Sequence, residues 1–110
     1  MVKYTPKRGD IVWLEFDPQK GKEIQKTRPA VVVSPLQYNQ KTGLGLFMPI
    51  TSQIKGYPFE VVIDHPKIHG AVLTDQIRSL DWHARKAKFV ASLPPRIIDD
   101  ILAKLHVLLD

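Results

Sequence analysis

The chain has 110 residues, of which 44% are hydrophobic and 25% charged, so we expect one globular domain over residues 1–110 with its own core. It contains no cysteine, which excludes disulfides and any site built on a thiolate. No apolar run approaches the roughly 18 residues of a membrane span, and no apolar segment of a secretory signal follows the basic N-terminus. A cytoplasmic protein without membrane association is expected.

The net charge of +5 is unevenly distributed along the chain. Residues 1–55 contain nine Lys and Arg against four Asp and Glu, whereas residues 56–110 contain seven of each kind. A local positive field attracts polyanions and speeds their association. The charge of the N-terminal half therefore suggests a nucleic-acid partner, although many basic proteins bind none.

Strand patterns come first in the chain. Ile11 to Phe16 is short, β-branched and aromatic, and it lies between turn signals. Pro29 to Ser34 is a near-continuous apolar run of strand length. Similar runs predict four further strands, at Leu44 to Ile50, Phe59 to Ile63, Gly70 to Leu73 with an extension towards Ile77, and Ala87 to Ala91. Leu36 to Gln40 and Leu80 to Arg85 are each expected to form a helical turn.

The C-terminal segment has helical periodicity. Its apolar residues form one stripe, made of Ile97, Ile98, Ile101, Leu102, Leu105, Leu108 and Leu109. Ser92 is the candidate cap, and Pro94-Pro95 suits a first helical turn because the first amides need no acceptor there. Strands in series with one closing helix predict a mainly β fold, in which the helix packs on a strongly bent antiparallel sheet or barrel.

Polar residues lie at the ends of the predicted strands. Arg28 lies at the mouth of a buried strand, where its planar guanidinium would be held at a fixed angle and could grip a phosphate through two hydrogen bonds. The others are Glu23 before the same strand, Thr51, Ser52 and Gln53 after the third, and Asp75, Gln76 and Arg78 after the fifth. Antiparallel neighbours would gather several of these at one rim. Taken singly, each is more often an idle, solvated side chain.

Several catalytic signatures are absent. The chain has no Gly-rich phosphate loop before a helix, no HExxH and no GxSxG. His65 and His69 are four residues apart, but Pro66 and Gly70 predict a loop there, so the two rings are not expected to share a helix face. We expect no metal site and no cofactor.

Longer motifs carry a family resemblance. The segments GDIVWLEFDPxxGxE, TRPAVVVSP, PITSQ, KGYPFEVV and LTDQIRSLDWxAR follow one another from Gly9 to Arg85. Together they resemble the MazF/PemK family of toxin endoribonucleases. The resemblance implies an SH3-like small β-barrel of the CcdB/PemK type with a C-terminal helix, present as a homodimer.

The resemblance also implies an activity. Members cut single-stranded RNA, above all mRNA, often at a short sequence and without a metal ion. The 2′-hydroxyl attacks the neighbouring phosphorus and leaves 2′,3′-cyclic phosphate and 5′-hydroxyl ends. A cognate antitoxin with a disordered acidic tail blocks the toxin, and any association with DNA is expected only through that antitoxin.

Such a reaction needs a base, a positive group for the phosphorane and a proton source. We expect Arg28 to stabilise the phosphorane and Thr51 to donate a hydrogen bond to a non-bridging oxygen. Glu23, which matches the family's GxE segment, is the candidate base and could instead read a nucleotide base.

RNA contacts are expected from side chains around this rim. Backbone contacts are assigned to Lys20, Lys22, Lys26 and Lys55, base contacts to Ser52, Gln53, Tyr57, Asp75 and Gln76, and a further RNA contact to Arg78. Tyr57 could instead pack under its loop. Trp13 and Phe16 are expected in the core, and Trp82 could lie at a dimer contact.

The sequence leaves two other functions open. The same barrel shape could serve a gyrase-directed toxin or a non-catalytic nucleic-acid-binding module, because fold alone does not specify activity. Neither alternative requires Glu23, Arg28 and Thr51 together.

Overall fold

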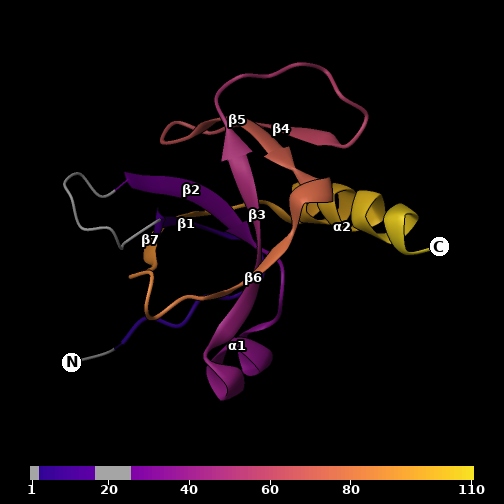
Figure 1. Cartoon of the computed structure of the whole chain (residues 1–110). Helices are drawn as coiled ribbons and strands as arrows, with labels where there is room; N and C mark the ends of the chain where they lie inside the picture. Colours follow the sequence, from indigo (N-terminus) through magenta and orange to yellow (C-terminus); the bar gives the residue numbers. More distant parts are fainter. Residues whose placement is uncertain (1–2, 17–25) are drawn as a thin grey trace.

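The computed structural model describes residues 3–16 and 26–110. In this part of the chain, seven strands form one curled antiparallel sheet that a C-terminal helix closes on one side (Figure 1). The strands are β1 (Asp10–Phe16), β2 (Lys26–Val32), β3 (Leu44–Thr51), β4 (Glu60–Asp64), β5 (His69–Leu73), β6 (Arg78–Asp81) and β7 (Lys88–Ser92). The helices are α1 (Leu36–Thr42), the 3-10 helix η1 (Thr74–Gln76) and α2 (Pro95–Leu109). The predicted fold class, mainly β with a C-terminal helix, is confirmed.

Strand β3 is the centre of the sheet. The strand order is β4-β5-β3-β2-β1-β7, and β6 also pairs with β3. Phe47 of β3 pairs with Val32 of β2 on one edge and with Arg78 of β6 on the other. At its far end, β3 pairs with β5 through Ile50 and Thr51. One strand therefore runs from α1 at one end of the molecule to the β4–β5 hairpin at the other (Figure 1).

The pairing of β2 with β3 stops before the end of β3. The last paired residues are Ala30 and Pro49. Neither Pro29 of β2 nor Pro49 of β3 has an N–H group to extend the ladder. The sheet consequently opens on this edge of β3 while the opposite edge continues along β5.

Two apolar clusters occupy the two faces of the sheet. Val31 and Met48 belong to the larger cluster, together with Ile101 of α2, whereas Val32 and Phe47 belong to the smaller one. Consecutive side chains of a strand point to opposite faces, so burial on both faces explains the near-continuous apolar run of β2.

Strand β1 contributes to both clusters. The register between β1 and β7 shifts between Ile11 and Val12, and both side chains are fully buried, one in each cluster. As in β2, burial on both faces makes consecutive residues of the strand apolar.

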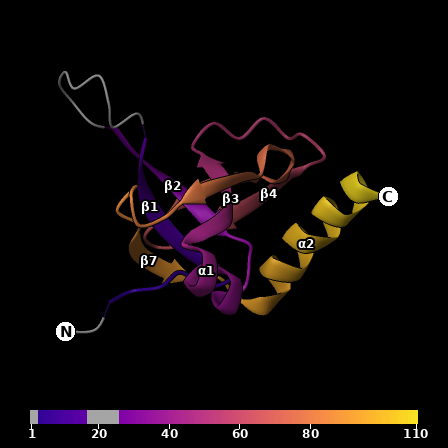
Figure 2. The ribbon, with the colours of Figure 1, turned by 60° about the horizontal axis from the view of Figure 1, so that its bottom comes forward.

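Helix α2 lies along one side of the curled sheet (Figure 2). Ile101 is buried, and Ile97, Ile98, Leu102 and Leu105 pack against the larger cluster. The end of the helix differs, because Val107, Leu108 and Leu109 are exposed. Only the first part of the predicted apolar stripe therefore packs on its own sheet. No helix in the described residues is long and apolar enough to cross a membrane.

Two local predictions are wrong and a third is right only in part. Leu80 to Arg85 begins in a strand, since Arg78–Asp81 pairs with β3, and then forms one helical turn, in which the Arg85 N–H donates to the Asp81 carbonyl at 3.1 Å. The fifth strand does not extend to Ile77, because the buried Thr74 hydroxyl donates to the Phe59 carbonyl at 2.6 Å and the chain turns into η1. Ser92 does not cap α2; its hydroxyl lies 3.4 Å from Oδ1 of Asp10.

A buried polar cluster ties the α1 end of the molecule together. The Ser34 hydroxyl donates to Oδ1 of Asn39 at 2.5 Å and accepts from the Leu46 N–H at 2.8 Å. The Asn39 amide donates to the carbonyls of Pro6 at 2.7 Å and Ser34 at 3.1 Å, and the Trp82 indole N–H donates to the Asn39 carbonyl at 3.1 Å. This buried polar cluster joins the N-terminal segment, α1 and the turn after β6.

Candidate active site

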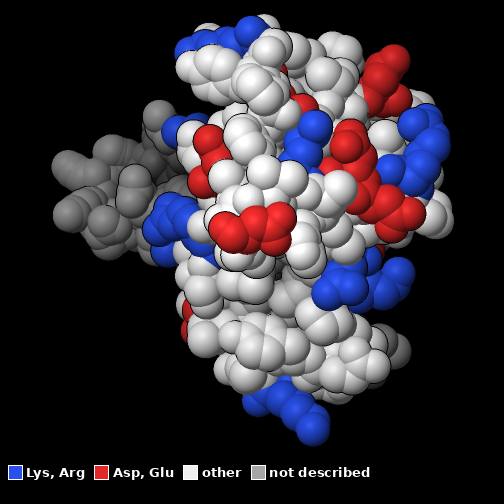
Figure 3. Space-filling model, turned by 90° about the vertical axis from the view of Figure 1, so that its right-hand side faces the viewer, with Lys and Arg blue, Asp and Glu red and all other residues white. Residues whose placement is uncertain are grey.

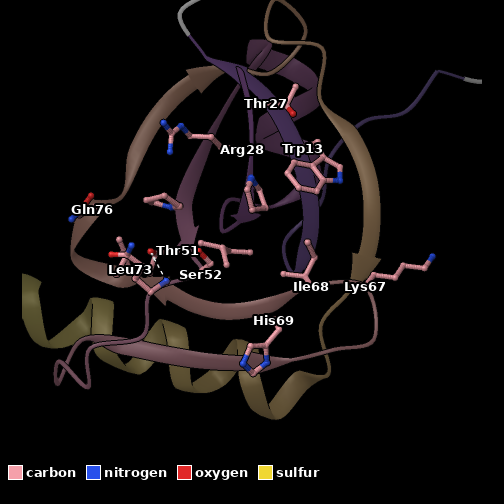
Figure 4. Close-up of a pocket in the computed structure, with 14 residues that line it drawn as sticks. Trp13, Thr27, Arg28, Thr51, Ser52, Lys67, Ile68, His69, Leu73 and Gln76 are labelled. Carbon is pink, nitrogen blue, oxygen red and sulfur yellow. Dashed lines mark hydrogen bonds between the residues drawn. The ribbon is translucent and has the colours of Figure 1, made fainter. Parts of the chain in front are cut away.

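A groove opens where the β2–β3 ladder stops. It has a volume of about 890 Å³ and lies between β2, the end of β3 and the β4–β5 hairpin (Figure 4). Its polar lining includes Arg28, Thr51, Ser52, Gln53 and Gln76, all of which the sequence had suggested as site residues. The structure thus brings residues from three separate chain segments to one cavity.

The strand register explains why Arg28 and Thr51 share this groove. Ala30 pairs with Pro49 and Val31 with Met48. Continuing that antiparallel register places Arg28 opposite Thr51 across the opening. Both residues line the groove, and Figure 4 shows them towards the same end of it.

Arg28 has open space on two sides. It is exposed at the edge of the groove and also lines a smaller cavity of about 190 Å³ with Gln76 and Arg78. Within residues 3–16 and 26–110, no carboxylate forms an ion pair with its guanidinium. The donors of this side chain are therefore available to an anionic ligand.

The hydroxyl of Thr51 is oriented by the loop that follows it. The backbone N–H of Gln53 donates to Oγ1 of Thr51 at 3.1 Å (dashed line in Figure 4). Because the oxygen already accepts this bond, the hydroxyl proton can be donated to a second group. The backbone of Thr51 is equally constrained, since a β-carbon at Gly70 of β5 would collide with the Thr51 carbonyl oxygen.

The other end of the groove has an aromatic and basic lining. Trp13, Lys67, Ile68 and His69 contribute to it (Figure 4). Nδ1 of His69 lies 3.4 Å from Oδ1 of Asp64. None of these four residues was predicted from the sequence to belong to the site.

The prediction that Trp13 belongs to the core is wrong. Its side chain is 36% exposed and lines the groove, whereas Val12 and Leu14 on either side are fully buried. Period-two alternation along β1 was the signal that could have found it. In the β1–β2 register Trp13 lies opposite Pro29, at the point where the sheet opens.

The remaining predicted site residues are more scattered. Lys55, Tyr57 and Asp75 are exposed and do not line the groove. Tyr57 is 58% exposed, so it does not pack beneath its loop. Lys20, Lys22 and Glu23 lie outside the described residues, as do the side chains of Phe16 and Lys26, whose backbones belong to β1 and β2.

Charge on another face of the molecule is mixed. Figure 3 shows basic and acidic side chains interspersed on the face seen from the side of the α2 C-terminus.

Among the residues that the structure describes, no group of three or more histidines and carboxylates could hold a metal ion. Trp82, for which the sequence suggested a dimer contact, donates its indole N–H to the carbonyl of Asn39 in the buried polar cluster.

Comparison with known proteins places this chain in a family. Residues 7–109 match the family model of PemK-like, MazF-like toxins of type II toxin-antitoxin systems. The chain is 47% identical over 107 residues to the endoribonuclease toxin MazF of Escherichia coli K12, which covers 97% of this chain and 96% of that protein. The chain belongs to this toxin family. The endoribonuclease toxin ChpB of the same strain is 35% identical to this MazF-like chain over 117 residues, with both proteins fully covered.

Solved structures confirm the MazF-like fold. A MazE-MazF crystal structure from Deinococcus radiodurans matches with a TM-score of 0.90 at 46% identity, over 97% of each chain. An endoribonuclease from a mycobacterial species, solved with its cognate antitoxin, matches with a TM-score of 0.78 over 94% of each chain. At 19% identity the second likeness shows the fold alone.

Proposed function

We propose that this protein is the endoribonuclease toxin of a type II toxin-antitoxin system. It cleaves single-stranded RNA within mRNA by attack of a 2′-hydroxyl on the adjacent phosphorus, without a metal ion, and so inhibits translation. The single observation that carries the proposal is the open groove in which Arg28, which forms no ion pair within the described residues, and the Thr51 hydroxyl lie on adjacent strands. The endoribonuclease names of relatives up to 47% identical support it.

Each group has a chemical role in this reaction. The 2′-oxygen loses its proton, forms a bond to phosphorus and generates a phosphorane with additional negative charge. Arg28 stabilises that charge through two parallel N–H groups, and Thr51 donates its hydroxyl proton to a non-bridging oxygen. The P–O5′ bond then breaks, and the departing oxygen takes up a proton from water that Arg28 orients. The products are a 2′,3′-cyclic phosphate and a 5′-hydroxyl.

Glu23 is the proposed base for the 2′-hydroxyl. It lies outside the described residues, in the segment between β1 and β2, and β2 carries Arg28. Glu23→Gln is expected to lower the single-turnover rate by about 10²-fold or more while the RNA dissociation constant stays within a few-fold. Equal losses in rate and affinity would assign Glu23 to binding a nucleotide base instead.

RNA recognition uses both ends of the groove in this proposal. Ser52, Gln53 and Gln76 contact base edges beside the scissile phosphate, while Lys67 holds the backbone. The exposed face of Trp13 is a stacking platform for a base, which binds without strong sequence preference.

A homodimer and an acidic antitoxin are the proposed protein partners, and DNA is reached only through the antitoxin. The end of α2 supports a protein contact there, because Val107, Leu108 and Leu109 are large apolar side chains that remain exposed. The proposed location is the cytoplasm, where mRNA is the available substrate.

The test is incubation of the purified protein with an unstructured RNA in the presence of EDTA. Cleavage that leaves 2′,3′-cyclic phosphate and 5′-hydroxyl ends is the expected result. Cleavage that requires added metal would contradict the metal-independent mechanism. Intact RNA, together with trapped gyrase–DNA complexes, would replace the proposal with a gyrase-directed toxin.

A further inference from the structure

The 52–59 loop, which connects β3 to β4, begins directly after Thr51. Its residues from Ser52 to Pro58 are all exposed, so apolar packing does not hold the loop in place. Ser52 and Gln53 at its start line the groove, and Ile54 and Tyr57 further along are exposed apolar side chains. Such a loop needs polar contacts to keep one conformation.

Glu60 supplies these contacts from the first position of β4. Its Oε1 accepts the backbone N–H of Gly56 at 2.9 Å and that of Lys55 at 3.2 Å, and its Oε2 lies 3.3 Å from the same Lys55 nitrogen. Two successive N–H groups that converge on one anion form the nest arrangement of the backbone. Gly56 has a φ of +80°, a conformation that glycine adopts without strain.

Glu60 itself is firmly held. Glu60 is only 9% exposed, and its backbone N–H donates to the Tyr57 carbonyl at 3.1 Å. The preceding carbonyl, that of Phe59, accepts both the N–H and the hydroxyl of the buried Thr74. No lysine, arginine or histidine in the described chain pairs with the Glu60 carboxylate, so its partners are the loop amides.

We propose that Glu60 is a positioning residue for the groove: it clamps the 52–59 loop and thereby sets RNA affinity and the choice of cleavage sequence. The inference rests on the proposed ribonuclease function. The connection runs through Gln53, whose side chain lines the groove and whose N–H binds the Thr51 hydroxyl. Glu60 acts only through the loop and does not touch the scissile phosphate.

The oxygen geometry makes Glu60→Ala and Glu60→Gln an informative pair. Oε1 accepts both amides, and Oε2 accepts a second, longer bond from the Lys55 N–H, so the amide oxygen of glutamine in the place of Oε1 can keep one bond to each amide, whereas alanine loses all three. We expect Glu60→Ala to raise KM at least about tenfold with a much smaller change in kcat, and to cut sequences that the parent protein leaves intact. Glu60→Gln should keep KM within about threefold of the parent value. Asp99→Ala, which removes an exposed carboxylate from α2, is the charge-matched control and should leave both constants unchanged.

Loop order can be measured without RNA. Trypsin cleaves after Lys55 only when the loop opens, so Glu60→Ala should accelerate cleavage at this bond at least about tenfold, and Glu60→Gln should not. If the alanine variant does not fold, Gly56→Ala tests the same clamp. A β-carbon there meets no atom within 4 Å but strains the backbone at a φ of +80°. It should raise KM and trypsin sensitivity in the same direction.

The two proposals fail in different ways. If the parent protein leaves RNA intact, the ribonuclease proposal falls, whereas parent-like protection of Lys55 in Glu60→Ala shows that the clamp is absent. A loop that opens without any change in KM or cleavage sequence overturns the positioning role. A glutamine variant as impaired as alanine also overturns it, because the charge rather than the hydrogen-bonding geometry would then matter.

Discussion

The two ends of β3 carry polar side chains in opposite conditions. At the α1 end, Ser34 and Asn39 are buried, and their polar groups bind one another and nearby backbone. At the groove end, Arg28 and Thr51 face open space. Ser34 and Asn39 find their hydrogen-bond partners within the protein. Arg28 and Thr51 keep donors that a ligand can use.

The two hydroxyls make this difference concrete. The Ser34 hydroxyl both donates, to Asn39, and accepts, from the Leu46 N–H. The Thr51 hydroxyl accepts from the Gln53 N–H, and its proton remains available. Buried polar groups of the first kind are costly to disturb, whereas groups of the second kind should affect stability little and catalysis strongly. Four substitutions test this division.

Arg28→Ala is expected to have the largest effect. Loss of the cation that stabilises the phosphorane should reduce kcat/KM by about 10³-fold, because removal of one preorganised charge-stabilising donor costs about that much. The melting temperature should change by less than about 2 °C, since the side chain is exposed and unpaired in the described chain. Single-turnover cleavage and thermal unfolding measure the two quantities. Arg96→Ala, an exposed cation on α2, is the control, and near-parental turnover of Arg28→Ala would remove Arg28 from the mechanism.

Asn39→Ala should show the reverse pattern. It leaves the carbonyls of Pro6 and Ser34 without this donor and should cost about 3 kcal/mol in the free energy of unfolding. Urea unfolding measures the loss. Single-turnover cleavage per folded molecule should remain within about threefold of the parent rate, because the cluster lies at the far end of β3. A large loss of rate in fully folded protein would mean that the two ends are coupled.

Thr51→Val and Ser34→Ala form a matched pair of hydroxyl deletions. Thr51→Val should slow single-turnover cleavage about 10- to 100-fold, because a hydrogen bond to a charged group contributes about 1.5 to 3 kcal/mol. Ser34→Ala should instead destabilise the fold by about 1 to 3 kcal/mol with an unchanged rate. Thr51→Ser, which keeps the hydroxyl, should retain most of the parent rate. Equal effects of the two deletions on stability and rate would erase the division between the two ends.

Tyr4→Phe tests the N-terminal segment next to the buried polar cluster and should have the smallest effect. The Tyr4 hydroxyl donates to Oδ2 of the buried Asp10 at 2.6 Å, and burial, followed by this hydrogen bond and the charge of Asp10, raises the pKa of Tyr4 well above its usual range. At pH 8 the substitution should cost about 1 to 2 kcal/mol in stability.

The pH dependence of this effect has a definite sign. A raised folded-state pKa contributes stability that is complete below the unfolded pKa of about 10 and declines above it, because the unfolded chain then releases the proton that the folded chain keeps. The stability advantage of the parent protein over Tyr4→Phe should therefore shrink between pH 8 and pH 11, by less than the roughly 1.4 kcal/mol of a fully shielded phenol, because Tyr4 is only partly buried and solvent screens it. Urea unfolding of both proteins at the two pH values checks this. A constant difference would mean that Tyr4 ionises alike in both states.

Sequence patterns predicted much of the fold for local reasons. Turn residues bounded most strands correctly, and the spacing from Ile97 to Leu105 predicted the packed face of α2. The prediction failed for short elements whose secondary structure depends on a partner strand. Arg78–Asp81 is a strand because β3 offers it a partner, and nothing in those four residues encodes that partner.

The candidate site also contains residues that the sequence predicted and one that it misplaced. Chain order and family motifs singled out Arg28, Thr51, Gln53 and Gln76, which do line one groove. Trp13 was placed in the core because an aromatic residue in an apolar strand is usually buried. Its exposure follows from the opening beside Pro29, which depends on where β2 leaves β3.

The amino-acid sequence by itself determined the family, the mainly β architecture and the chemical groups at the strand ends, because these are properties of residue type, spacing and local turn formation. Only the tertiary structure decided that Arg28 lies across the opening from Thr51, that Trp13 faces the groove, and that Glu60 binds the amides of the 52–59 loop. The physical reason is that β3 pairs with β2, β5 and β6 along its length, and the register of these pairs joins segments far apart in the chain. The β2–β3 ladder ends where two prolines lack the N–H groups to continue it.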